Sequence, residues 1–115
     1  MANRVLLRTS VLMFFAHMVL LVLHANARTL FYVLGTCTSI ANHALTRESA
    51  KYIDRATMLV GFVWDLCLIF REPSVMVLVI GAALCARPPN AQHAFAHVLI
   101  TLAHTQMLYK RAIGP

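Results

Sequence analysis

The chain has 115 residues, of which 60% are hydrophobic and only 12% are charged. Soluble domains carry about 25% charged residues, so this composition excludes an ordinary water-soluble enzyme. The longest polar stretch between apolar blocks runs from Thr46 to Lys51, which leaves no material for a soluble domain. We therefore expect one all-α domain, residues 1–115, that lies within a membrane.

The formal net charge of +6 does not indicate a nucleic-acid partner, because of where the cations lie. Most basic residues flank apolar blocks, where they reach lipid headgroups and help to fix topology. We expect membrane lipids as partners and no nucleic acid. The cysteines lie inside apolar blocks without a C-x-x-C pair, and we expect them to be small core residues: Cys37, Cys67 and Cys85.

The first apolar block spans about Val5 to Leu23. It is about as long as a full membrane span, which takes about 20 residues of helix. The segment Ala25-Asn26-Ala27 resembles a signal-peptidase site, and cleavage there would leave four helices. The length of the block favours retention, so we expect an integral, multi-pass bundle of about five transmembrane helices.

The other four blocks span about Thr29 to Ala44, Ile53 to Phe70, Val75 to Ala86 and Ala91 to Tyr109. Proline-containing breaks separate the last three, because proline disfavours helix at the residue before it. The fourth block is short for a span, so it must thin the bilayer or shelter among its neighbours. Alternating helix directions put six basic residues on the N-terminal side and four on the other, which favours a cytosolic N-terminal side.

Polar residues at the ends of three blocks fall at one depth if each block is a helix. Ser39 and His43 are four residues apart near the end of the second block and share a helix face. Asp54 opens the third block, and His93 and His97, again four apart, open the fifth. Three imidazoles with an open position are typical of a catalytic zinc site. We therefore predict that His43, His93 and His97 bind zinc.

Zinc in such a site lowers the pKa of a bound water and polarises a substrate carbonyl. Asp54 would accept a proton from that water or orient it, and Ser39 would donate a hydrogen bond to the water or to the oxyanion. The structural alternative is that these histidines only hydrogen-bond neighbouring helices, as polar side chains in membrane bundles often do.

A second polar layer lies farther along the helices, with His17, Asp65 and His104 at similar depth. Asp65 follows Asp54 by eleven residues and His104 follows His97 by seven. Both spacings are close to whole helical turns, so Asp65 shares a helix face with Asp54, and His104 shares one with His97. We expect a buried, hydrogen-bonded Asp–His pair. A second site, a polar wall for a ligand head group, and haem bound by His17 and His104 are the alternatives.

The lower-layer residues follow an ordered pattern: S-x-x-x-H over Ser39–His43, then Asp54, then H-x-x-x-H over His93–His97. This order resembles the CREST superfamily of membrane metal-dependent hydrolases, which includes the alkaline ceramidases, the progestin and adiponectin receptor family and the Per1-type proteins. The spacing from His43 to Asp54 looks most like the alkaline ceramidases. Typical members have seven helices, so a five-helix chain would be a shortened form.

The resemblance implies that the three histidines hold zinc while Asp54 and Ser39 attend the water. The implied reaction is hydrolysis of a lipid amide or ester, such as ceramide, near the cytosolic boundary. The alternative function is a non-catalytic small subunit or scaffold of a larger membrane complex. In that case a membrane-protein partner or a second copy of the chain would cover the exposed helix surfaces.

Overall fold

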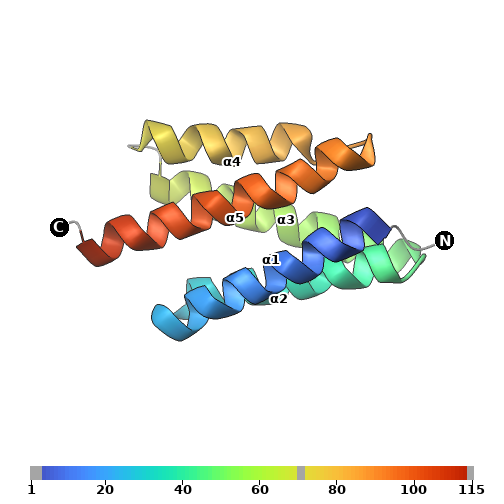
Figure 1. Ribbon diagram of the computed structural model, residues 1–115, viewed down its shortest axis with the longest axis horizontal. Helices are drawn as coiled ribbons and strands as arrows, with labels where there is room; N and C mark the ends of the chain where they lie inside the picture. Colours follow the sequence, from blue (N-terminus) through green and yellow to red (C-terminus); the bar gives the residue numbers. More distant parts are fainter. Residues whose placement is uncertain (1–3, 70–71, 114–115) are drawn as a thin grey trace.

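The computed structural model describes residues 4–69 and 72–113. Within these ranges the chain is all α-helix, with five helices and no strand, as predicted. In chain order they are α1 (Arg4–Leu23), α2 (Ala27–Ala44), α3 (Glu48–Ile69), α4 (Pro73–Cys85) and α5 (Asn90–Ile113) (Figure 1).

The helix ends follow local capping chemistry. Asn26 caps α2: its side chain accepts a hydrogen bond from the backbone N–H of Thr29, and the Thr29 hydroxyl accepts one from the backbone N–H of Asn26. The segment Ala25-Asn26-Ala27 thus contains the N-cap and the first residue of α2. α3 begins at Glu48, earlier than the predicted Ile53, because the polar stretch before the apolar block forms its first turns. Glu48 suits the positive end of the helix dipole there.

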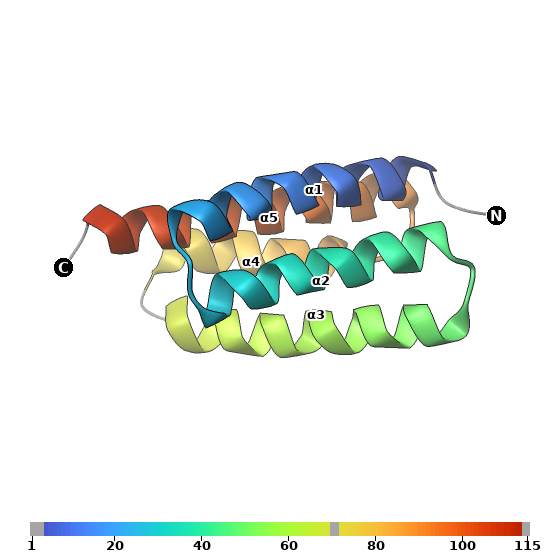
Figure 2. The same cartoon turned by 90° about the horizontal axis from the view of Figure 1, so that it is seen from below.

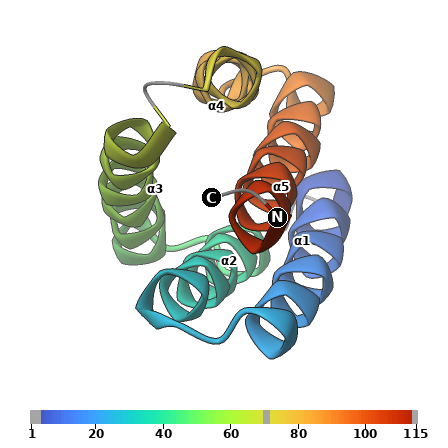
Figure 3. The same ribbon diagram turned by 90° about the vertical axis from the view of Figure 1, so that its left-hand side faces the viewer.

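The five helices pack as a ring, in which each contacts the next and α5 returns to α1 (Figure 3). Successive helices run in opposite directions along the 47 Å long axis, so α1 and α5 are parallel neighbours (Figures 1 and 2). Among these neighbouring pairs, α3 and α4 pack least closely. We call the end where α1, α3 and α5 begin the N-terminal end of the bundle.

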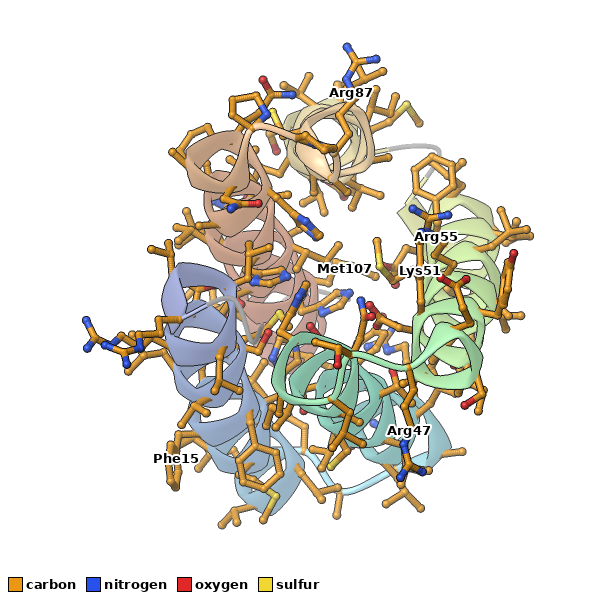
Figure 4. The ribbon with its side chains drawn as sticks, turned by 90° about the vertical axis from the view of Figure 1, so that its right-hand side faces the viewer. Phe15, Arg47, Lys51, Arg55, Arg87 and Met107 are labelled. Atoms are coloured by element: carbon orange, nitrogen blue, oxygen red, sulfur yellow. The ribbon has the colours of Figure 1, made fainter. Side chains whose placement is uncertain are left out.

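The distribution of polarity is the reverse of that in a water-soluble protein. Inside the bundle, the side chains of His17, Asp54 and Asp65 are only 1–2% exposed. On the surface, Phe15 is 61% exposed and Val77 69%, and Phe15 points away from the other helices (Figure 4). Charged side chains are almost never fully buried in proteins unless they are paired, so the interior groups require partners.

The prediction that the cysteines are core residues is wrong. Cys37 and Cys67 are exposed and Cys85 is half-buried. The buried faces of these helices are occupied by polar residues and by an apolar cluster between α4 and α5, so Cys37 and Cys67 fall on the outer faces. That apolar cluster consists of Val75, Val79, Ala103 and Met107.

By length and composition, α1 is the single helix among the described residues that is long and apolar enough to cross a membrane. α4 is apolar but has only 13 residues. The helices α2, α3 and α5 are long enough, but the polar and charged residues along them lower their hydropathy. The structure thus supports one candidate span, and the predicted five-span arrangement is not established by this criterion.

Candidate metal centre

Three imidazoles meet at the N-terminal end of the bundle. His43 comes from the last turn of α2, and His93 and His97 come from successive turns at the start of α5. One candidate ligand atom from each lies within 4.8 Å of those of the other two. The ring centroids are 4.9, 5.2 and 5.5 Å apart. The structure therefore brings together three histidines that the helical spacing placed at one depth.

Two of these imidazoles have buried nitrogens that lack a partner. The Nε2 atoms of His43 and His93 are buried, and no group in the described ranges hydrogen-bonds to them. A buried polar atom without a partner costs about 1–3 kcal/mol, so such atoms require an explanation. A cation coordinated by imidazole would satisfy both nitrogens, and the residues present therefore fit a metal ion. Imidazole suits zinc, copper, iron and nickel, so the ligand set alone does not select among them.

The third imidazole, His97, is hydrogen-bonded to a residue of α1. The Nδ1 atom of His97 lies 2.8 Å from the hydroxyl oxygen of Thr9. That hydroxyl also donates to the backbone carbonyl of Leu6 at 3.1 Å. Sequence reasoning missed Thr9, because no spacing rule connects it to His97.

Asp54 lies at the same end and is held by α2. The side-chain amide of Asn42 donates to its Oδ2 at 2.9 Å. The hydroxyl of Thr38 is 3.3 Å from its Oδ1, but the same hydroxyl donates to the carbonyl of Gly35 at 2.7 Å. Asn42 is thus the closer partner. No hydrogen bond joins Asp54 to a histidine in the part of the chain described here.

Ser39 is 4% exposed, and its hydroxyl also has a partner on α1. The Oγ atoms of Ser39 and Ser10 are 2.8 Å apart, and either can be the donor. Ser10 is fully buried and was not predicted as a site residue. The hydroxyl of Ser39, which was predicted to assist the zinc-bound water, therefore lies inside the bundle and is hydrogen-bonded to the hydroxyl of Ser10.

A cavity of about 440 Å³ extends from this end into the bundle. Ser39, Asp54 and His97 contribute to its wall at the N-terminal end. Ligand pockets for small molecules typically measure about 300–1,000 Å³, so the volume suits a ligand. Leu59 of α3 and Ala83 of α4 are exposed and also line the cavity, which places an opening between the two least closely packed helices.

Deeper in the cavity wall lies a hydrogen-bonded group that we call the interior network: His17, Tyr32, Asp65 and His104. His17 donates from Nδ1 to the Met13 carbonyl at 2.8 Å, and its Nε2 is 2.7 Å from Nδ1 of His104. His104 Nε2 is 2.8 Å from Oδ2 of Asp65, and the Tyr32 hydroxyl donates to Oδ1. The Tyr32 and His104 rings are stacked, with centroids 3.6 Å apart.

The predicted Asp–His pair is confirmed, and the structure extends it to four helices. The alternative of haem between His17 and His104 is wrong. The nitrogen atoms that would bind the iron from opposite sides are hydrogen-bonded to each other instead. A metal ion cannot be accommodated between two atoms 2.7 Å apart.

Basic side chains surround the N-terminal end of the bundle. Figure 4 views this end face-on, with labelled cations on α3 and near the ends of α2 and α4: Arg47, Lys51, Arg55 and Arg87. Arg55 is exposed and lines the cavity. Its position adds positive charge near the histidines, where an anionic ligand group would be attracted.

The chain therefore combines a three-histidine cluster, a buried carboxylate and an adjoining cavity at one end of an α-helical bundle. No protein-family model, no curated protein and no solved structure matches this chain.

Proposed function

We propose that this protein is a membrane-embedded, zinc-dependent hydrolase of a lipid amide or ester. The observation that carries the proposal is the convergence of His43, His93 and His97, two of them with unpartnered buried nitrogens, beside a cavity. Three imidazoles that leave a fourth position open are the ligand set of catalytic zinc sites. The S-x-x-x-H, Asp and H-x-x-x-H order, similar to the alkaline ceramidases, supports the same reading.

The membrane location is part of the proposal. Its support is the reversed polarity of the bundle, since lipid tolerates apolar surface and confines ionisable groups to the interior. The helices of 18 to 24 residues would be roughly 27–36 Å long, which suits a hydrocarbon core of about 30 Å. The 13-residue α4 would lie sheltered against α5 or thin the bilayer. The cations around the N-terminal end favour a cytosolic position for the histidine cluster.

Bound zinc would supply an activated water and polarise the scissile carbonyl. Asp54 would take a proton from the attacking water and return it to the leaving group. The hydrogen bond from Asn42 leaves acceptor sites free on the carboxylate. When Ser10 donates to Ser39, the proton of Ser39 is free to bond the substrate oxygen.

The cavity suits the acyl chain of such a substrate. Besides the polar residues at the N-terminal end and in the interior network, the cavity wall contains apolar side chains such as Phe31, Phe62 and Ile100. The opening between α3 and α4 would face the lipid, so a chain would enter sideways without leaving the apolar phase. The substrate class that fits is a membrane lipid with an amide or ester near the cytosolic boundary, such as ceramide.

Zinc content and hydrolysis, measured on the same preparations, test the proposal. Wild type and a His24→Ala control should contain about one zinc per chain, because His24 lies outside the cluster. His43→Ala and His93→Ala should lose the zinc together with hydrolysis of fluorogenic lipid amides and esters. Negligible zinc in zinc-replete wild type would end the proposal. Bound zinc without hydrolysis of any lipid would favour the non-catalytic subunit.

A further inference from the structure

We infer that Thr9 of α1 is a positioning residue for the metal centre: it fixes His97 in the tautomer that presents Nε2 to the ion. The inference rests on the proposed metal function, but it assigns a role to a residue on a helix that supplies no ligand. Thr9 and His97 are 88 positions apart in the sequence, and their side chains meet where α1 and α5 pack as parallel neighbours.

The proton positions follow from the hydrogen bonds. The Thr9 hydroxyl lies 3.1 Å from the carbonyl oxygen of Leu6 and 2.8 Å from Nδ1 of His97. We assign the single hydroxyl proton of Thr9 to the Leu6 carbonyl, which can only accept. The hydroxyl oxygen must then accept from His97, which places the imidazole proton on Nδ1. A neutral imidazole carries one proton, so Nε2 keeps its lone pair.

This tautomer matches what the other two histidines offer. His43 and His93 have buried Nε2 atoms without partners, and His97 has its Nδ1 occupied by Thr9. The geometry thus points to a centre in which all three histidines would coordinate through Nε2. Metal-binding histidines commonly donate their other N–H to a second group, which fixes the ring and its tautomer. Among the described residues, Thr9 fills this role for His97, and no side chain fills it for His43 or His93.

The inference makes α1 part of the centre. Cleavage after Ala27 would remove Thr9 and Ser10, and with them the α1 partners of His97 and Ser39. A chain without α1 would keep all three histidines and still lose the group that orients one of them. Retention of the first helix would then strengthen metal binding, beyond its role in packing.

Zinc affinity of the full chain, measured by competition with a chelator, tests the role of Thr9. Thr9→Val keeps the shape but removes the hydroxyl, and it should weaken zinc binding about 10- to 100-fold. Thr9→Ser should restore an affinity close to that of wild type. Thr105→Val is the matched control, because the exposed Thr105 bonds the Thr101 carbonyl of its own helix; it should bind zinc as wild type does.

The tautomer can be read independently in metal-free protein with ¹⁵N-labelled histidine. His97 should carry its proton on Nδ1 in wild type and in Thr9→Ser, and the Nδ1–H population should fall in Thr9→Val. A proton on Nε2 of His97 in wild type, or unchanged zinc affinity in Thr9→Val, would overturn the inference. Neither of these two results would contradict the proposed hydrolase. Absence of zinc in the wild type would end the hydrolase proposal, but the tautomer of His97 could still be measured.

Discussion

The Nε2 atom of His17 lies 2.7 Å from the Nδ1 atom of His104, 87 residues farther along the chain. His17 donates its Nδ1 proton to the Met13 carbonyl, so neutral His17 can only accept at Nε2. His104 must therefore donate from Nδ1, and one further proton is shared between its Nε2 and Asp65. Tyr32 donates to the same carboxylate. Hydrogen bonds of defined direction therefore connect α1, α2, α3 and α5.

Removing the carboxylate of the interior network should destabilise the bundle. Asp65→Ala is expected to lower the free energy of unfolding by about 1–3 kcal/mol, because His104 and Tyr32 would lose their buried acceptor. Glu48→Ala is the control, since Glu48 is an exposed acid on the same helix, and its effect should stay within about 0.5 kcal/mol. Unfolding by a denaturing detergent in mixed micelles measures both. Equal stability of the two variants would show that the network does not hold the helices together.

The helices and the three-histidine cluster were predictable because both follow from spacing. Residues four apart share a helix face, so His93 and His97 had to point the same way, and His43 lay at the same depth on a helix of opposite direction. The Asp65–His104 pair was predictable by the same reasoning. The start of α3 was not, because the polar residues of its first turns resemble a loop.

The contributions of α1 to the site could not be predicted from spacing. A threonine in a helix can satisfy its hydroxyl with a carbonyl of the preceding turn, as Thr101 and Thr105 do. Nothing in the sequence distinguishes these residues from Thr9, whose hydroxyl also reaches His97 on another helix. Which hydroxyl crosses between helices depends on how the helices pack, and that requires the structure.

Replacing the proposed general base should separate catalysis from metal binding. Asp54→Asn is expected to lower the turnover of a lipid amide about 10²- to 10⁴-fold, since the amide cannot accept the proton of the attacking water. Zinc content should stay at the wild-type level, because Asp54 is outside the three-histidine group. Asn42→Ala should cause a smaller loss, as it removes one hydrogen bond to the carboxylate. Wild-type turnover in Asp54→Asn would exclude Asp54 as the base.

Narrowing the cavity should weaken lipid binding without touching the histidines. Ala83 of α4 lines the cavity, whereas Val77 of the same helix is 69% exposed and does not. Ala83→Phe should weaken binding of a long-chain fatty amide at least about tenfold, a loss of about 1.4 kcal/mol, because the ring occupies space for the chain. Val77→Phe should bind as wild type does. Displacement of a fluorescent fatty amide from metal-free protein in digitonin micelles measures both, and equal affinities would place the chain elsewhere.

The proposed membrane location predicts that a charge on the outer surface is costly only at the bilayer centre. Leu12 and Val22 of α1 are 68% and 77% exposed, the first near the middle of the helix and the second near its end. Leu12→Lys should oppose membrane insertion by about 3 kcal/mol, and Val22→Lys much less, because a lysine near a helix end extends its ammonium group to the interface.

Glycosylation of an acceptor site placed between α1 and α2 reports the inserted fraction of each variant in microsomes. A strong loss for Leu12→Lys with near-normal insertion of Val22→Lys is the expected outcome. In a water-soluble bundle both positions are surface sites, where a substitution changes stability by no more than about 0.5 kcal/mol. Similar insertion of both variants would therefore contradict a lipid-facing α1, and with it the proposal that the reversed polarity of this bundle is an adaptation to a membrane.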